Sequence, residues 1–223
     1  MARVILPGVL QVFFPRALVN AYLVRADVPT IIDTGTPGAA ERVLGALGGV
    51  GLRPGDVGRI LLTHAHADHA GNAAELAGAT GAAVHVAPGA APFVSERREQ
   101  PRPQAATPIG HGLVQYVKVA LPWTLDPFET EASLVDGAQV GPFRVVDTPG
   151  HSAGHVSLLW EERGILFAGD AAANITAVGP HPAADDPDLS RATFRRLGEH
   201  RFDSACFGHG LALRERAAER FRG

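Results

Sequence analysis

Residues 63–72 read THAHADHAGN and place three histidines and an aspartate within six positions, directly after the apolar run RILL. His64 and His66 are two positions apart, so on an extended backbone their rings leave the chain on the same side. Asp68 and His69 follow where the chain bends into a helix, and they can face a second point nearby. Imidazole and carboxylate groups are ligands that suit a divalent metal such as zinc. The cluster therefore predicts a metal site.

Further candidate ligands stand later in the chain, each where an apolar strand stops and a glycine-containing loop begins, a usual place for functional residues. They are His151 and His155 in DTPGHSAGH, Asp170 in ILFAGD and His209 in ACFGHG. If these strand ends converge with the first cluster, the chain supplies five histidines and two aspartates, without counting His155. That set exceeds one tetrahedral site and fits two metals that share a ligand.

Five motifs, in order, resemble those of the metallo-β-lactamase fold superfamily: DTG with Asp33, THAHADH, GHSAGH, FAGD and GHG. The resemblance runs from about residue 20 to residue 210. It implies a four-layer αββα sandwich of the α/β class, with the metals at one edge of two facing sheets.

The resemblance also implies a role for each motif residue. The first metal would be held by His64, His66 and His151, the second by Asp68, His69 and His209, and Asp170 would bridge them. Asp33 would support the histidine loop from beneath by hydrogen bonding. His155 matches the last histidine of the GH-x-x-GH pattern, which is usually not a ligand, so we expect it to support the ligands or to pack in the turn.

A serine nucleophile is the competing interpretation of residues 150–154, GHSAG, which match the G-x-S-x-G elbow. Ser152, Asp170 and His209 even follow the order of an α/β-hydrolase triad. The elbow should lead from a strand into a helix, whereas HVSLLW has the pattern of a strand. This interpretation also leaves THAHADH unexplained, so the sequence favours the metal site.

Hydrolysis is the chemistry that a dinuclear site would support. Two ions about 3.5–4 Å apart can lower the pKa of a shared water from 15.7 towards about 7, which makes a metal-bridging hydroxide available as nucleophile. Asp68, next to that hydroxide, is the catalytic candidate for moving its proton. We expect two divalent ions. Zinc suits these donors best, and iron or manganese also fits them.

The bridging aspartate directs the substrate prediction. β-Lactamases of this fold generally have Cys or Ser where this chain has Asp170, so the resemblance is to glyoxalase II-like thioesterases and lactonases. Glyoxalase II itself carries a C-terminal helical domain, and only 14 residues follow His209. We therefore expect a small-molecule ester, thioester or lactone as substrate.

Two other functions use the same residues. Sulfur dioxygenases of the superfamily, which oxidise persulfides, bind one iron through equivalents of His64, His151 and Asp170. A metal-binding protein without catalysis is the third alternative, and it is disfavoured because no ligand is missing.

The composition of the 223 residues is that of a globular protein, with 46% hydrophobic and 19% charged residues. We expect one domain, residues 1–223. The net charge of −3 gives no positive field to attract nucleic acid or an anionic membrane. No run of 18 apolar residues occurs, and Pro7 and Pro15 interrupt the apolar N-terminus, which predicts a strand rather than a signal peptide. A cytoplasmic protein without nucleic-acid or membrane partners is expected, and the single Cys206 excludes an intramolecular disulfide.

The metal residues must be positioned by alternating strands and helices. We expect strands at residues 18–25, 30–34, 59–63, 82–86, 143–148, 155–160, 164–168 and 204–208. Helices are expected at 38–47, with Thr36 as N-cap and Pro37 in the first turn, and at 70–80, 188–200 and 213–222.

Residues 88–132 lack such a pattern and are rich in Pro, Gly and charge, which indicates a lid or insertion on the substrate side. Its bulky side chains, the tentative substrate contacts, are Phe93, Tyr116, Trp123 and Phe128. Four histidines have no motif around them and are expected to be surface or satisfied histidines, although two (His111 and His181) lie in loops that could approach the site. The four are His85, His111, His181 and His200.

Overall fold

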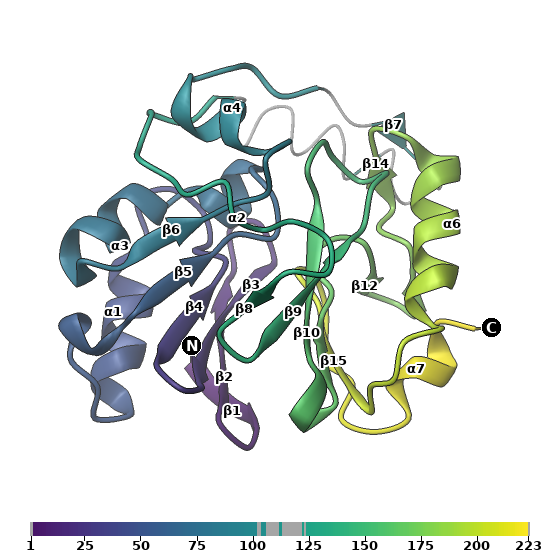
Figure 1. Cartoon of the computed structure of the whole chain (residues 1–223), viewed down its shortest axis with the longest axis horizontal. Helices are drawn as coiled ribbons and strands as arrows, with labels where there is room; N and C mark the ends of the chain where they lie inside the picture. Colours follow the sequence, from purple (N-terminus) through teal and green to yellow (C-terminus); the bar gives the residue numbers. More distant parts are fainter. Residues whose placement is uncertain (1, 102–103, 106–111, 113–121, 123, 223) are drawn as a thin grey trace. The chain divides into compact units, whose positions relative to one another are not determined.

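The computed structural model describes residues 2–101, 104–105, 112, 122 and 124–222. The chain divides into two compact units, Met1–Gln100 with Pro122–Ser133, and Pro101–Leu121 with Leu134–Gly223. Each unit has its own mixed β-sheet and its own helices (Figure 1). Within the described part of the chain, no helix has both the length and the apolar character needed to cross a bilayer.

The first unit is built on a six-stranded sheet in the order β1-β2-β3-β4-β5-β6. The first four strands are antiparallel neighbours, and β4, β5 and β6 run parallel. Their bounds are β1 Ala2–Leu6, β2 Val9–Phe14, β3 Val19–Arg25, β4 Pro29–Ile32, β5 Arg59–Leu61 and β6 Ala83–His85. Because parallel strands end at the same edge, the segments that follow β4 and β5 begin side by side. The apolar N-terminus, predicted to be a strand, forms two strands that pair as the hairpin β1–β2.

The helices of this unit connect the parallel strands, except α4, which follows β6. They are α1 Glu41–Gly49, the 3₁₀ turn η1 Pro54–Asp56, α2 Ala67–Ala70, α3 Ala73–Thr80 and α4 Ala91–Ser95. The prediction that Thr36 caps the first helix is wrong, since that helix starts at Glu41 after Ala40. The reason is Asn72, whose side chain donates to the Thr36 carbonyl at 2.8 Å and accepts the Ala39 N–H at 2.9 Å. These bonds hold residues 36–39 in a turn, so the helix can begin only afterwards.

The second unit is built on a five-stranded sheet in the order β15-β11-β10-β9-β8. The β11–β15 pair is parallel and the other pairs are antiparallel. The bounds are β8 Gln139–Val140, β9 Phe143–Asp147, β10 Val156–Trp160, β11 Ile165–Phe167 and β15 Ser204–Cys206. Two short pairs lie outside this sheet, β12 Ala173–Asn174 with β13 Val178–Gly179, and β7 Gln104–Ala105 with β14 Ala183–Ala184.

The core of the second unit lies between this sheet and the helices α6 Pro187–Leu197 and α7 Ala217–Arg220. The 3₁₀ turn η2 Glu161–Arg163 connects β10 to β11 and has no buried residue. Asp186 caps α6 by accepting the N–H groups of Asp188 and Leu189. The rings of Phe194 and Phe221 stack at 4.8 Å in the core. The expected helix at 213–222 is shorter than predicted because the Leu213 backbone pairs with Ala205 of β15 instead of continuing a helix.

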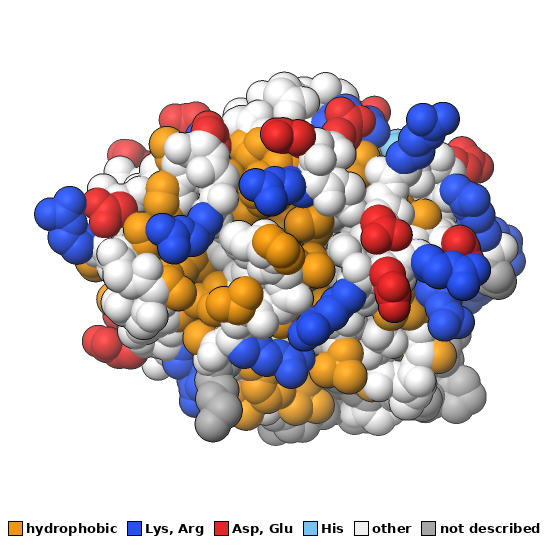
Figure 2. Space-filling model, turned by 90° about the horizontal axis from the view of Figure 1, so that it is seen from below, with side chains coloured by type: hydrophobic (Ala, Val, Ile, Leu, Met, Phe, Trp, Pro, Cys, Tyr) orange, Lys and Arg blue, Asp and Glu red, His pale blue; other side chains and the backbone are white. Residues whose placement is uncertain are grey.

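Charges of both signs are spread over the face shown in Figure 2, with apolar side chains between them. Among the described residues visible there, neither sign forms a continuous field.

Candidate metal centre

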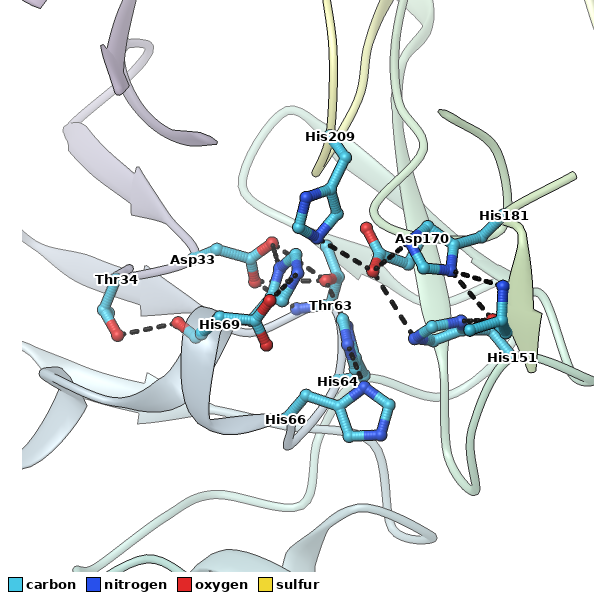
Figure 3. Close-up of polar contacts among 12 residues, drawn as sticks. Asp33, Thr34, Thr63, His64, His66, His69, His151, Asp170, His181 and His209 are labelled. Carbon is cyan, nitrogen blue, oxygen red and sulfur yellow. Dashed lines mark hydrogen bonds and ion pairs between the residues drawn. The ribbon is translucent and has the colours of Figure 1, made fainter. Parts of the chain in front are cut away.

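The histidine loop of the first unit follows β5 and is supported by Asp33, which directly follows β4 (Figure 3). Asp33 is buried and has a positive φ of 55°. Its Oδ1 accepts the Thr63 backbone N–H at 2.8 Å. Its Oδ2 accepts the Thr63 hydroxyl at 2.9 Å and lies 2.9 Å from His69 Nδ1. One carboxylate thus connects the start of the loop to its end.

The bond to Asp33 sets the tautomer of His69. A carboxylate can only accept, so the ring proton lies on Nδ1 and the lone pair lies on Nε2. Histidine ligands commonly have this arrangement, in which the second nitrogen donates to a carboxylate or carbonyl. His69 Nε2 lies 4.0 Å from Asp68 Oδ2, and both residues are buried.

His64 and His66 lie beside each other in the same loop. His64 Nε2 is 2.9 Å from His66 Nδ1, and His64 Nδ1 is 3.0 Å from the Thr63 hydroxyl. The two rings meet edge to face, with centroids 4.6 Å apart. At this distance the two ring nitrogens face each other within hydrogen-bond reach.

The end of the loop is fixed by the segment after Asp33. The His69 carbonyl accepts both the backbone N–H of Thr34, at 2.6 Å, and its hydroxyl, at 2.7 Å. The Asn72 side chain donates to the Thr34 carbonyl at 2.7 Å. The loop is therefore held in place by buried hydrogen bonds on both sides.

In the second unit, Asp170 is the centre of a buried group of histidines (Figure 3). Its Oδ2 lies 3.5 Å from His151 Nε2, 3.4 Å from His209 Nε2 and 3.6 Å from His181 Nε2. Charge-assisted hydrogen bonds are shorter, about 2.7–2.9 Å. Two ligands that bind one tetrahedral ion at about 2.0–2.2 Å are about 3.4 Å apart. The spacing therefore matches that of metal ligands.

The strands of the second unit explain this convergence. Asp170 follows β11 and His209 follows β15, its parallel neighbour, while His151 lies in the loop between β9 and β10. His155 ends that loop, and its Nε2 accepts the Asp170 backbone N–H at 2.9 Å. The buried His155 ring therefore contacts the backbone of Asp170, while its Nδ1 lies 2.7 Å from the Thr148 hydroxyl.

Two glycines allow the close backbone approaches that position these loops. A Cβ on Gly150, where φ is +119°, would lie 2.3 Å from the Ser190 backbone nitrogen. A Cβ on Gly210, where φ is +96°, would lie 2.0 Å from the Asn174 carbonyl oxygen. Only glycine fits at both positions, directly before His151 and directly after His209.

Ser152 does not have the surroundings of a nucleophile. Its buried Oγ has no hydrogen-bond partner among the described residues, whereas a catalytic serine needs a base within reach. The loop also leads into strand β10 rather than a helix. Both observations support the rejection of the serine-hydrolase interpretation.

The sequence places His181 among the surface or satisfied histidines and indicates only that its loop could approach the site. It is buried beside Asp170, in the segment between β13 and β14. No residue pattern around it signals this position, since PHP matches no ligand motif.

The tentative substrate contacts are only partly described. Tyr116 and Trp123 lie outside the described residues, as does His111. Phe93 is half-buried in α4. Phe128 lines a hollow of about 640 Å³ in the first unit, together with Ala91, Ser95, Pro127, Glu129, Thr130 and Ala132.

The family model described as metallo-beta-lactamase superfamily matches residues 15–209. The chain belongs to the metallo-β-lactamase superfamily. The resemblance inferred from the five motifs is thereby confirmed. Membership of the superfamily implies that divalent metal is bound. The donor set fits this implication, because each unit presents buried imidazole nitrogens next to carboxylates.

Individual proteins with similar sequences support membership of the superfamily. The chain is 33% identical over 171 residues to the uncharacterized protein YobT of Bacillus subtilis. This matched region covers 71% of this chain and 64% of that protein. It is 36% identical over 112 residues to a hydroxyacylglutathione hydrolase of Halorhodospira halophila. That matched region covers 50% of this chain and 31% of that enzyme. The chain thus spans less than two thirds of the length of these relatives.

Solved structures confirm the predicted fold class. A metallo-β-lactamase family protein from Thermus thermophilus matches with a TM-score of 0.64 and 26% identity, covering 97% of this chain and 79% of that chain. The similarity extends over both units. The fold is therefore that of the superfamily, as the motif order implies.

Proposed function

We propose that this protein is a metal-dependent hydrolase that cleaves a small-molecule ester, thioester or lactone. The observation that carries the proposal is the buried carboxylate of Asp170, at a position where the resemblance implies Cys or Ser in most β-lactamases of this fold. Its Oδ2 is surrounded by three histidine Nε2 atoms at 3.4–3.6 Å. The hydroxyacylglutathione hydrolase relatives, named as hydrolases, support the same reaction class.

The proposed centre contains two divalent ions, most suitably zinc. We assign the first to His64, His66 and His151, the second to Asp68, His69 and His209, and the shared ligand to Asp170. This assignment rests on the motif order of the superfamily. When bound, the ions would supply a water of lowered pKa and would polarise the carbonyl group of the substrate.

Residues of this chain would perform the remaining steps. We assign the proton transfer to Asp68, a buried carboxylate in the first turn of α2, which would take the proton of the attacking water and later deliver it to the leaving group. Asp33 would hold His69, and His155 would hold the backbone of Asp170. Both keep ligands oriented without touching substrate.

Substrate selection is proposed for the hollow that Phe128 lines. Ligand sites are mostly apolar, with a few polar groups that fix orientation. The hollow has both kinds of group, Ala91, Pro127 and Phe128 beside Ser95 and Thr130. An acyl chain of a small ester or thioester is the partner that this lining suits.

Metal analysis combined with kinetics tests the proposed function. Protein purified without added metal should contain about two ions per chain and should hydrolyse members of a thioester and lactone panel. Asp68→Asn keeps the size of the side chain but removes the charge, so kcat should fall by roughly 10²–10⁴-fold. Arg53→Gln, in an exposed ion pair of η1, is the matched control and should leave kcat unchanged.

The opposite outcome is equally specific. A single iron per chain under metal-replete conditions, with oxygen consumption on a persulfide and no hydrolysis of the panel, would replace the hydrolase with the dioxygenase. Full activity of Asp68→Asn with unchanged metal content would remove the proton-transfer role.

A further inference from the structure

His181 lies outside every motif of the chain, between Pro180 and Pro182, yet it is buried within the histidine group of the second unit. Its ring centroid is 4.8 Å from that of His151 and 5.2 Å from that of His209. Histidine is rarely buried among other histidines unless they share a cation or a proton. The position of His181 therefore calls for a function.

One backbone carbonyl orients both rings. Ala183 O lies 2.9 Å from His151 Nδ1 and 2.8 Å from His181 Nδ1. A carbonyl oxygen has two lone pairs and can accept from both rings. The Ala183 N–H also lies 3.2 Å from His181 Nδ1, but the shorter contact to the carbonyl favours a proton on Nδ1. Both rings then have their lone pair on Nε2.

The two Nε2 atoms are directed to the same carboxylate oxygen. His181 Nε2 lies 3.6 Å and His151 Nε2 lies 3.5 Å from Asp170 Oδ2. The three ligand atoms lie within 4.8 Å of one another, and all three residues are buried. Two nitrogen lone pairs and a carboxylate oxygen, each an electron donor, stabilise one another only through a cation between them.

We propose that His181 is a metal ligand, and that it forms with His151 and Asp170 a binding site for a divalent transition-metal ion. The inference rests on the proposed metal centre and adds to it a nitrogen ligand that the superfamily motifs do not contain. Two imidazoles and one carboxylate are donors that suit zinc, cobalt and iron(II). All three residues belong to the second unit, so its fold alone preorganises this set.

The first test is cobalt(II) and zinc binding to the full chain carrying His181→Gln. Chelator competition should show an affinity for one ion that is lower by more than about 10-fold, and the visible cobalt(II) bands should lose intensity. The control is His200→Gln, because His200 Nδ1 contacts Arg144 in the same unit but lies outside the histidine group. Unchanged cobalt spectra and zinc affinity in a folded His181→Gln protein would overturn the proposal.

A second variant covers the case in which His181→Gln fails to fold. His181→Cys places a thiol at the same position, and a thiolate bound to cobalt(II) gives a charge-transfer band that the wild type lacks. Appearance of the band supports direct ligation, and its absence in a cobalt-loaded protein overturns it. If the wild type binds no metal, the proposed function fails. If the wild type and the His181 variants bind metal equally well, only the assignment of His181 as a ligand fails.

Discussion

The imidazole of His155 accepts the backbone N–H of Asp170 at 2.9 Å. Because Nε2 accepts, Nδ1 must donate, and it lies 2.7 Å from the Thr148 hydroxyl. That hydroxyl in turn lies 3.2 Å from the Ser157 hydroxyl, which donates to the Ala168 carbonyl at 3.0 Å. A directed chain of buried hydrogen bonds thus runs from the backbone of Asp170 through three side chains and back to the end of β11.

Replacing His155 should therefore weaken metal binding without removing a ligand. His155→Ala leaves the Asp170 N–H without its acceptor, so we expect metal affinity to fall about 10–100-fold. The free energy of unfolding should fall by about 1–3 kcal/mol. Chelator competition and urea denaturation measure the two effects. Thr148→Ser keeps the hydroxyl and should be close to wild type, whereas equal losses in both variants would argue against the directed chain.

Asp33→Asn tests the tautomer of His69. The amide can still accept from Thr63, but its NH₂ group would meet the His69 Nδ1–H, so the ring would have to move its proton to Nε2. We expect metal affinity to fall at least about 10-fold. Asp27→Asn, which removes an exposed ion pair with Arg59, should change neither affinity nor stability measurably. Wild-type metal content in Asp33→Asn would show that the carboxylate is dispensable.

Gly150→Ala should lower the free energy of unfolding by more than its backbone conformation alone would explain. The new methyl would lie 2.3 Å from the Ser190 nitrogen, whereas a methyl at Gly137, with φ of +76°, meets nothing within 4 Å. Gly137→Ala should lose about 1–2 kcal/mol for its left-handed conformation. Gly150→Ala should lose about 1–3 kcal/mol more because the loop must shift. Urea unfolding of both variants checks this, and equal losses would contradict the steric argument.

Phe128→Ala tests the proposed substrate hollow. If the ring contacts the acyl group, KM should rise by about 10-fold or more for the preferred thioester, with kcat little changed. Val4→Ala truncates an exposed apolar side chain in the same unit and serves as the control. Metal content should stay at the wild-type value in both. Unchanged KM across acyl chain lengths would place the substrate elsewhere.

Burial raises the pKa of Asp185 to about 6 from its ordinary value of 3.8. Its Oδ1 is buried and has no hydrogen-bond partner among the described residues. The folded chain thus holds this proton more tightly than the unfolded chain, so this contribution to stability is complete below pH 3.8 and is lost as pH rises from there to about 6. Asp185→Asn should remove that loss and raise the free energy of unfolding at pH 7. Urea denaturation of chelator-treated wild type and variant between pH 4 and pH 8 measures this difference. Identical pH profiles for the two proteins would contradict the prediction.

Much of the candidate site could be predicted from local sequence. Apolar runs that end in Gly-containing loops mark the ends of β5, β11 and β15, where the histidine loop, Asp170 and His209 begin. Strand periodicity and ligand chemistry are local properties, so they can be recognised from a few neighbouring residues. The superfamily and its fold followed from five such motifs in order.

Long-range contacts decided the rest. Thr36 has the sequence of an N-cap, but the Asn72 side chain, 36 positions away, holds its carbonyl and delays α1 to Glu41. His181 has no motif, and only the pairing of β14 with β7 and the Ala183 carbonyl bring it beside Asp170. The Ala183 acceptor is only two positions from His181, but the approach to Asp170 depends on how the segment between β13 and β14 packs, and that leaves no mark on the residues around the histidine. For that reason the sequence alone could predict the motif residues as ligands, whereas only the tertiary structure places His181 beside Asp170.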